Sequence, residues 1–327
     1  MTARRETVRR GLRSLIPAAL VAALLSAACG GGEPATFVTI LTGSTSGVYY
    51  PLGVGLSQLF RTALPEANVS VQATAASAEN LRLLEAERGE LAFTLGDVLA
   101  DAWEGNADAG FTAPLGKLRA VAAIYSNYIQ IVASADSGVR TIADLKGKRI
   151  SVGAPGSGTE LNARAIVRAA GMSYDDFSKV EYLSFSESVE LIKNRQLDIT
   201  LQSAGLGVAS LRDLAANLRI VVVPIPAGIV KNVGRPVYQQ AIIPAGTYDG
   251  QLEDVETASI RNVLVTHDTV PDDVVYRMTK ALFENLDQLA ASHVAAEGIS
   301  RETAYDNLPV PLHPGAAAYY REVGLLE

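Results

Sequence analysis

The sequence has 327 residues, of which 48% are hydrophobic and 19% charged, a composition typical of a globular protein with two lobes of roughly 100–150 residues each. Its formal net charge is −7, but residues 1–28 hold five arginines against one glutamate, so the rest of the chain carries −11. This acidity excludes nucleic acid as a partner, because the chain offers no basic surface to neutralise backbone phosphates.

The N-terminal segment has the features of a secretory signal peptide at residues 1–28. A basic stretch is followed by about fifteen apolar residues that end in small side chains. A retained membrane anchor is the less favoured alternative, because spanning a bilayer takes about twenty apolar residues. The segment VRRGLR (8–13) is similar to a twin-arginine export signal, so both the Sec and the Tat routes stay open.

Cys29, the only cysteine, follows this segment directly. The letters LLSAAC resemble the lipobox of bacterial lipoproteins, although Leu25 stands four residues before the cysteine instead of three. An exported protein with one cysteine has no internal disulfide to form. We therefore expect Cys29 to carry a lipid and residues 29–35 to be a tether to the membrane.

From residue 36 onward, strand-like and helix-like segments alternate, which predicts an α/β protein with a mostly parallel sheet. The first series ends in a long extended run at 118–134. Its expected strands are 36–43, 68–74 and 91–96, and its expected helices are 48–64, 77–89 and 97–105.

A second series follows and ends in another long extended run at 256–269. The segment 234–251 is punctuated by proline and glycine and is expected to be irregular, whereas 272–295 is expected to be one long amphipathic helix. The remaining expected elements are a helical turn, a strand, a Gly/Ser loop and a helix within 141–172, strands at 180–185, 197–205 and 218–225, and helices at 187–196 and 208–217.

Two long extended runs around a complete α/β series indicate a chain that crosses twice between lobes. We expect lobe I to comprise residues 36–126 and 256–327, and lobe II to comprise 127–255. Each lobe would be a central sheet flanked by helices, with a ligand cleft between the lobes.

Each lobe begins with a strand, a loop rich in glycine and hydroxyl side chains, and a helix: TGSTSG (42–47) in the first and GAPGSGT (153–159) in the second. A helix N-terminus exposes unpaired N–H groups and a partial positive charge, and glycines let a ligand approach the backbone. Capping for stability alone is the competing interpretation of either loop. The presence of one loop in each lobe favours an anionic ligand clamped between them. The residues expected to meet it are Gly43, Ser44, Thr45, Gly47, Tyr49, Ser157, Gly158 and Thr159.

A carboxylate fits these loops better than a nucleotide phosphate does. Neither loop contains the lysine of the GxxxxGK[ST] phosphate-binding pattern. A carboxylate can be held by N–H and hydroxyl donors alone.

Nothing in the sequence points to catalysis, a metal or a cofactor. The histidines at 267, 293 and 313 are scattered without metal-ligand spacing, and no GxSxG nucleophile elbow occurs. We therefore expect a binding protein that is not an enzyme.

The ends of other strands supply further candidates for the cleft. Ser77 and Asn80 begin a helix, with helix capping as the alternative for Ser77. Asp97 follows a strand and would either hold a ligand ammonium or cap a helix. Tyr125 lies where the chain first crosses between lobes, with Ser126 and Asn127 beside it, and Gln202 follows the strand-like residues LDITL (197–201) of the second lobe.

Several stretches resemble the TAXI proteins, which are the solute receptors of tripartite ATP-independent periplasmic (TRAP) transporters. The similarity runs from about residue 37 to residue 322, nearly the whole mature chain. The stretches that carry it are GSTSGVYYPLG (43–53), SAENLRLLEAERGELAF (77–93), DLKGKRISVGAPGSGTELNARAI (144–166), PDDVVYRMTKALFENLD (271–287) and PLHPGAAAYYRE (311–322).

This resemblance implies a type II periplasmic-binding-protein fold that closes around one small ligand and delivers it to a permease driven by an ion gradient. It also implies a ligand such as glutamate, glutamine or a 2-oxoglutarate-like carboxylate. The chain departs from the family pattern near the cleft, at Leu95-Gly96 before Asp97, at 205–208 and at 125–127. Fold and role therefore transfer more securely than the identity of the ligand.

Three alternatives remain open at the level of sequence. The first is a receptor that serves an ATP-driven importer instead of a TRAP permease. The second is a receptor that presents its ligand to a membrane sensor kinase. The third is an exported enzyme on the same fold, which is less favoured because no nucleophile or cofactor loop is evident.

Overall fold

The computed structural model describes residues 36–327, so the predicted signal peptide, Cys29 and the tether lie outside the described residues. The strands are β1 Thr36–Leu41, β2 Ala67–Gln72, β3 Leu91–Leu95, β4 Leu118–Ser134, β5 Arg149–Ser151, β6 Lys179–Glu181, β7 Ile199–Ala204, β8 Ile220–Val223, β9 Gln239–Ile243 and β10 Val255–His267. The α-helices are α2 Tyr49–Ala63, α3 Ser77–Glu85, α4 Gly96–Glu104, α5 Gly158–Ala169, α6 Phe185–Lys193, α7 Ala209–Asn217, α8 Ala227–Asn232, α9 Asp272–Glu284, α10 Leu286–Ala290 and α11 Pro314–Glu322.

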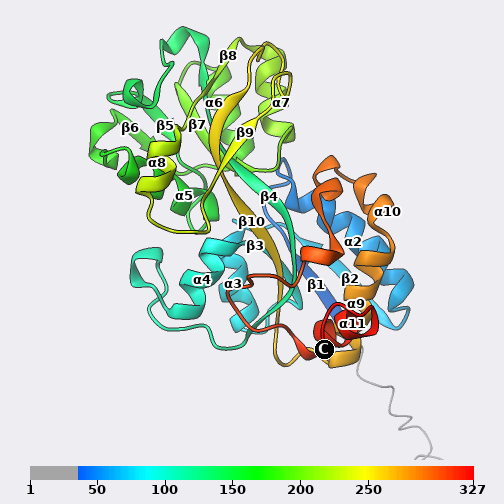
Figure 1. Cartoon of the computed structure of the whole chain (residues 1–327). Helices are drawn as coiled ribbons and strands as arrows, with labels where there is room; N and C mark the ends of the chain where they lie inside the picture. Colours follow the sequence, from blue (N-terminus) through cyan, green and yellow to red (C-terminus); the bar gives the residue numbers. More distant parts are fainter. Residues whose placement is uncertain (1–35) are drawn as a thin grey trace, which may run out of the picture. The chain divides into compact units, whose positions relative to one another are not determined.

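The long strands β4 and β10 join the two lobes, as the two extended runs of the sequence predict. They pair with each other in antiparallel fashion from Leu118–His267 to Tyr128–Ser259. Toward one end β10 also pairs with β3, and toward the other end β4 pairs with β7 and β8. Figure 1 shows the remaining elements gathered around the two ends of this pair, with helices flanking the sheet. The predicted two-lobed α/β architecture is confirmed.

The sheet is mixed, whereas the sequence predicts a mostly parallel one. Within residues 36–327 the strand order is β2-β1-β3-β10-β4-β7-β5-β6, with β8 beside β4 and β9 beside β10. Parallel pairing joins β1 to β3 and β5 to both β6 and β7. Every pair that includes β4 or β10 is antiparallel, because the chain leaves the first lobe along one of these strands and returns along the other.

The β4–β10 ladder is irregular at Asn262. The register shifts between Arg261 and Val263 and again between Leu264 and Val265. A bulge of this kind bends a strand and redirects its side chains. Asn262 is fully buried, and its amide lies in the middle of the molecule, beneath the site described below.

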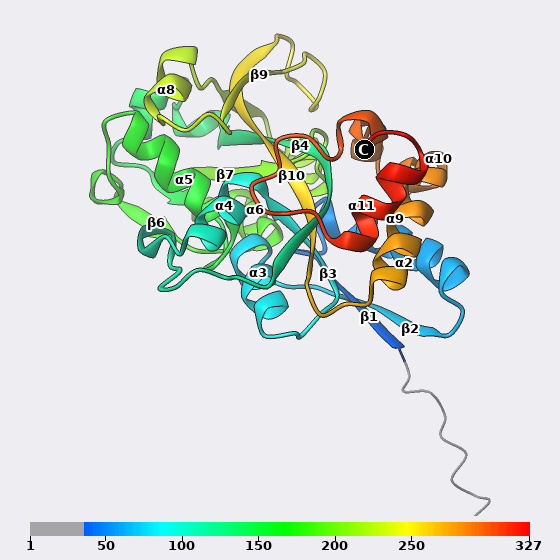
Figure 2. The same ribbon diagram turned by 60° about the horizontal axis from the view of Figure 1, so that its bottom comes forward.

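Three helices cover one face of the first lobe. In α2, Leu52, Leu56 and Phe60 recur at four-residue spacing and are buried, as expected for an amphipathic helix. Their core includes Phe283 of α9 and Tyr319 of α11, whose rings stack with centroids 5.8 Å apart. Figure 2 shows α2, α9 and α11 on the same side of the molecule.

Two local predictions are wrong. The long helix expected at 272–295 ends at Glu284, and α10 follows as a separate short helix. The Asn285 side chain donates a hydrogen bond to the carbonyl of Ala281 at 2.8 Å, and such local bonding competes with helix continuation. The segment expected to be irregular contains β9, which pairs with the start of β10.

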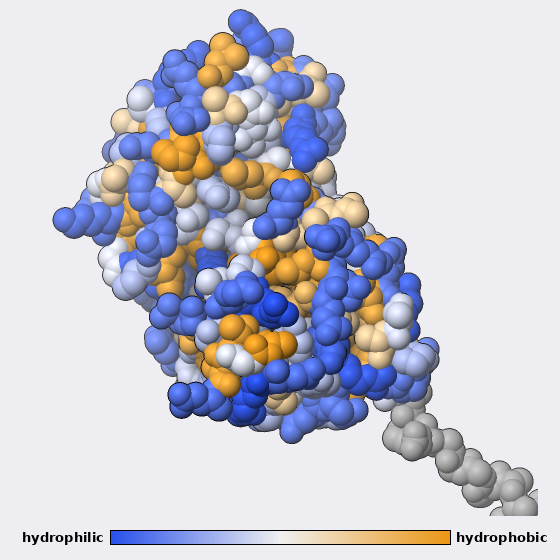
Figure 3. All heavy atoms as spheres, turned by 45° about the vertical axis from the view of Figure 1, so that its right-hand side comes forward, coloured by the Kyte–Doolittle hydropathy of each residue, from blue (hydrophilic) through white to orange (hydrophobic). Residues whose placement is uncertain are grey.

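Hydrophilic side chains cover most of the face that Figure 3 displays, and smaller apolar areas lie between them. Among residues 36–327, no helix combines the length and the apolar character needed to cross a bilayer.

Candidate functional site

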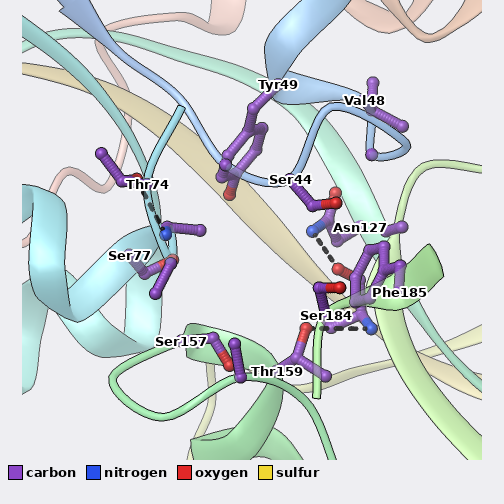
Figure 4. Close-up of a pocket in the computed structure, with 18 of the residues that line it drawn as sticks. Ser44, Val48, Tyr49, Thr74, Ser77, Asn127, Ser157, Thr159, Ser184 and Phe185 are labelled. Atoms are coloured by element: carbon purple, nitrogen blue, oxygen red, sulfur yellow. Dashed lines mark hydrogen bonds between the residues drawn. The ribbon is translucent and has the colours of Figure 1, made fainter. Parts of the chain in front are cut away.

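A cavity of about 300 Å³ lies between the two lobes. Its wall is built by four loops that each lead into a helix: residues 43–49 before α2, 73–77 before α3, 154–159 before α5 and 184–186 before α6. The first two loops belong to the first lobe and the other two to the second. Figure 4 shows side chains of all four loops around one common space.

The N-termini of α2, α3, α5 and α6 therefore meet at one cavity. Ser157 and Ser184 cap their own helices, accepting hydrogen bonds from the N–H groups of Glu160 (3.1 Å) and Glu187 (3.4 Å). At the start of α2 and of α3, in contrast, Val48 and Ala76 provide no side-chain cap. N–H groups at a helix start carry partial positive charge, so the convergence favours an anion.

The loop before α3 is held in an unusual conformation. Ala76 has a φ of 76°, which is uncommon for a residue with a side chain. The Thr74 hydroxyl accepts a hydrogen bond from the Ala76 N–H at 2.9 Å and donates one to Asn80 Oδ1 at 2.6 Å. Asn80 Nδ2 in turn donates to the carbonyls of Thr42 (2.7 Å) and Phe93 (2.8 Å). These bonds tie the loop to β1 and β3.

A chain of hydrogen bonds forms the floor of the cavity. The Tyr49 hydroxyl donates to Asn262 Oδ1 at 2.5 Å, and Asn262 Nδ2 donates to Asn127 Oδ1 at 2.8 Å and to the Tyr125 carbonyl at 2.9 Å. Asn127 Nδ2 then donates to the Ser203 carbonyl at 2.9 Å. The chain connects α2, β10, β4 and β7. Burial raises the pKa of Tyr49, so its hydroxyl stays protonated and acts as a donor.

Two hydroxyl groups in the wall have no partner among the described residues. They are Tyr125 Oη and Ser203 Oγ, in side chains that are 3% and 5% exposed. Buried hydroxyl groups are normally hydrogen-bonded, because an unpaired one costs about 1–3 kcal/mol. Both oxygen atoms are themselves buried, so neither is presented to the open space of the cavity.

The wall of the cavity is electrically neutral. Among the described residues that line it, none is Asp, Glu, Lys, Arg or His. Val48, Tyr49, Leu95 and Phe185 supply apolar surface. An anion held here would depend on N–H and hydroxyl donors and not on a cationic side chain.

The structure brings most of the predicted ligand-binding residues together at this cavity. Those that line it are Gly43, Ser44, Thr45, Gly47, Tyr49, Ser77, Tyr125, Ser157, Gly158 and Thr159. Asn80, Asp97 and Gln202 are absent from the wall. Asn80 braces the loop before α3, and Gln202 accepts a hydrogen bond from Ser210 at 2.6 Å.

Asp97 contacts the opposite lobe instead of the cavity. It is 1% exposed, and its Oδ2 accepts hydrogen bonds from Tyr238 Oη (2.7 Å) and Asn162 Nδ2 (2.8 Å). One turn along α4, Asp101 forms an ion pair with Arg235 at 2.9 Å. Burial raises the pKa of the Asp97 carboxyl above its ordinary value of 3.8. We name Asp97, Asp101, Asn162, Arg235 and Tyr238 the interlobe polar cluster.

Sequence reasoning missed part of the wall. The lining residues not singled out there include Thr74, Ser184, Phe185 and Ser203. A signal existed for Ser184, because Ser184 and Glu187 have the spacing of a capping box where the predicted strand 180–185 meets the predicted helix 187–196. Thr74 and Ser203 carry no such signal. Asn127 was a candidate only through its place at the crossing between lobes, and it also lines the cavity.

Comparison with known proteins gives a family and a fold. A profile described as the NMT1-like family matches residues 40–324. The structure is similar to the periplasmic binding protein BugD, with a TM-score of 0.55 at 12% identity, over 89% of this chain and 95% of that one. It is also similar to a protein from Bordetella bronchiseptica RB50, with a TM-score of 0.54 at 14% identity, over 88% and 98% of the two chains.

A third similar structure is the binding-protein component of an ABC phosphonate transporter from Pseudomonas aeruginosa. Its TM-score is 0.53 at 10% identity, over 82% of this chain and 80% of that one. At such low identities the likeness shows the fold, and it is the two-lobed fold that the sequence predicts.

Replacing Asn262 tests the floor of the cavity. Asn262→Ala is expected to lower the free energy of unfolding by about 1–3 kcal/mol, because it leaves the buried Tyr49 hydroxyl without an acceptor. Urea unfolding at neutral pH measures the change, and Tyr49→Phe in the same background is expected to restore part of it. Asn232→Ala, at an exposed position, serves as the control and should change stability by less than about 0.5 kcal/mol. A loss for Asn262→Ala no larger than the control's would contradict this role.

The pH dependence of stability tests the burial of Asp97. A raised pKa means that the folded protein holds this proton more tightly than the unfolded chain does. Stability therefore falls as pH rises from about 3.8 through the raised value. In Asp97→Asn, which does not titrate, this decline is expected to be smaller in thermal unfolding followed by circular dichroism between pH 4 and pH 7. The exposed Asp249→Asn should keep the wild-type slope; equal slopes for wild type and Asp97→Asn would sink the assignment.

Proposed function

The chain belongs to the NMT1-like family, and from its cleft we propose that it is an extracytoplasmic solute-binding receptor that captures a small anion by closure of two lobes. One observation carries the proposal: four helix N-termini, two from each lobe, meet at a cavity whose described wall holds no charged side chain. Neither lobe alone provides all four donors, so the ligand favours the closed arrangement.

The similar structures support this function. BugD is described as a periplasmic binding protein, and the Pseudomonas aeruginosa protein is described as the binding component of a transporter. We extend the periplasmic location to this chain. The lipid anchor at Cys29 and the lobe boundaries at 126/127 and 255/256 are part of the proposal as well.

We propose a carboxylate as the anion, as the sequence predicts. Carboxylate oxygens accept several hydrogen bonds, and the hydroxyl and N–H groups of the four loops are donors. The ligands that the TAXI resemblance implies, namely glutamate, glutamine and 2-oxoglutarate-like acids, all carry this group.

Two kinds of transporter remain candidates for delivery. The comparisons favour an ATP-driven importer, because one similar structure comes from an ABC transporter. The motif resemblance to TAXI proteins favours a TRAP permease. Uptake by intact cells distinguishes them, since collapse of the ion gradient abolishes TRAP-driven uptake, whereas depletion of ATP abolishes uptake by an importer.

The cavity gives little support to catalysis. General acid–base chemistry depends most often on His, Glu, Asp, Lys or Cys, and none of these is among the described lining residues. The serine and tyrosine hydroxyl groups there lack an adjacent base to activate them. Transfer of ligand to a sensor kinase is compatible with the same cavity and would show itself as signalling without uptake.

Identification of the natural ligand tests the receptor function. Protein purified from its native periplasm is denatured, and the released small molecules are measured by mass spectrometry. We expect one small carboxylate in about equal amount with the protein. Release of a metal or of a phosphorylated cofactor would contradict a carboxylate receptor.

Replacing Gly158 tests closure. A Cβ at this position would lie 2.6 Å from Leu95 Cδ1 and 2.7 Å from Ser77 Oγ, both on the opposite lobe. Gly158→Ala is therefore expected to keep the lobes apart and to reduce the released ligand at least about tenfold. Gly228→Ala, where a Cβ meets nothing within 4 Å, is the matched control and should retain full occupancy. Full occupancy in both variants would rule out this closed arrangement.

A further inference from the structure

The interlobe polar cluster joins the two lobes beside the cavity, and none of its members is among the described lining residues. Asp97 and Asp101 belong to α4 of the first lobe, whereas Asn162, Arg235 and Tyr238 belong to the second. The Asp97 carboxylate accepts hydrogen bonds from Tyr238 at 2.7 Å and from Asn162 at 2.8 Å, and both of these bonds cross between the lobes. The burial of this carboxylate therefore depends on the lobes being together.

Other direct contacts between the lobes do not depend on a titrating group. The Glu79 N–H donates to the Gly156 carbonyl at 3.2 Å, and Arg164 Nη1 donates to the Asp108 carbonyl at 2.8 Å. Backbone groups do not titrate, and an arginine stays charged in the range where carboxyl groups titrate. Titratable carboxyl groups take part in the contact between the lobes through the interlobe polar cluster instead.

The surroundings of Asp97 favour its neutral form in the closed arrangement. Its Oδ1 atom is buried without a partner among the described residues. Burial raises the pKa of the carboxyl, although the Tyr238 hydrogen bond and the charge of Arg235 act in the opposite direction. The charge of Asp101 adds to the rise. Tyr238 and Tyr49, the latter on α2, remain protonated because burial raises the pKa of each.

Taking the proposed closure of the two lobes as given, we propose that closure takes up a proton at Asp97, so that the receptor holds its solute more tightly at lower pH. Opening removes both hydrogen-bond partners of the carboxyl and places it in water. Asp97 thus acts on the cavity through the position of the lobes and not through contact with the solute.

The direction of the effect follows from proton linkage. In water the Asp97 carboxyl has its ordinary pKa of 3.8, and in the closed arrangement its pKa is higher. As pH rises from about 3.8 through the raised value, the closed arrangement loses stability relative to the open one. The apparent affinity for solute falls with it, because that affinity is proportional to the fraction of receptor in the binding-competent state.

Retention of the solute that the receptor carries from its native periplasm tests this coupling. Loaded protein is brought to equilibrium by dialysis at a series of pH values from 5 to 8, and bound and free solute are measured by mass spectrometry. The dissociation constant is expected to rise by at least about threefold over this range, and by no more than about tenfold per pH unit for a single proton. A dissociation constant that does not rise overturns the proposal.

Two variants assign the coupling to Asp97. Asp97→Asn does not titrate and is expected to lose most of the rise, whereas the exposed Asp249→Asn should keep the wild-type profile. Arg235→Gln removes a charge that favours the ionised carboxylate, so it should move the rise to higher pH. A rise in Asp97→Asn as large as that of the wild type, or an unshifted profile in Arg235→Gln, would show that another group titrates and would overturn the assignment.

Small-angle X-ray scattering on the same samples separates opening of the lobes from a change within the cavity. Loss of solute at higher pH is expected to accompany a larger radius of gyration, and loss at a constant radius contradicts coupling through closure. Retention that is independent of pH refutes the coupling alone and leaves the receptor function intact. If native protein carries no solute at any pH, the receptor function itself fails, and the coupling fails with it.

Discussion

The amide of Asn262 is the contact on which the geometry of the cleft depends. It accepts from Tyr49 and donates to Asn127 and to the backbone of Tyr125, so one side chain fixes the start of α2 and the middle of β4 at the same time. Its position at an irregularity of the β4–β10 ladder lets a residue of a central strand point toward the cavity floor. Because the amide is fully buried, its donor and acceptor atoms can form hydrogen bonds only with groups of the protein. Its partners likewise have few other groups to bond with.

A cleft that depends on helix N-termini has a particular selectivity. A cationic side chain would attract any anion strongly, whereas N–H and hydroxyl groups bind only where their directions match the ligand's oxygens. The described wall therefore holds no charged side chain when the cleft is empty. Two of the four helix starts come from each lobe, so the ligand itself completes the contact between lobes. The interlobe polar cluster adds a second contact beside the cavity, made by Asp97 and Arg235 without ligand.

Local pattern was sufficient for the two-lobed α/β architecture and for most of the cavity wall, but not for the mixed direction of the strands. The run at 118–134 is long, apolar and rich in β-branched residues, and β4 occupies the same residues. The glycine and hydroxyl residues between a strand and a helix predicted that the loops before α2 and α5 lie at the cleft.

The direction of the Asp97 side chain could not be predicted from local pattern. It depends on a hydrogen bond from Tyr238, which lies 141 residues away along the chain. Asn262 was missed for the same reason: an asparagine within a strand has no local pattern that reveals its partners. The sequence pattern also missed the end of α9 at Glu284, where the Asn285 side chain bonds back to the Ala281 carbonyl.

The pairing of β4 with β10 also has a mechanical consequence. A ladder of backbone hydrogen bonds resists stretching and sliding of its strands, but it bends and twists at low cost, most readily where the register is irregular. We therefore expect the two lobes to move relative to each other by bending and twisting of this ladder, with its backbone hydrogen bonds kept intact.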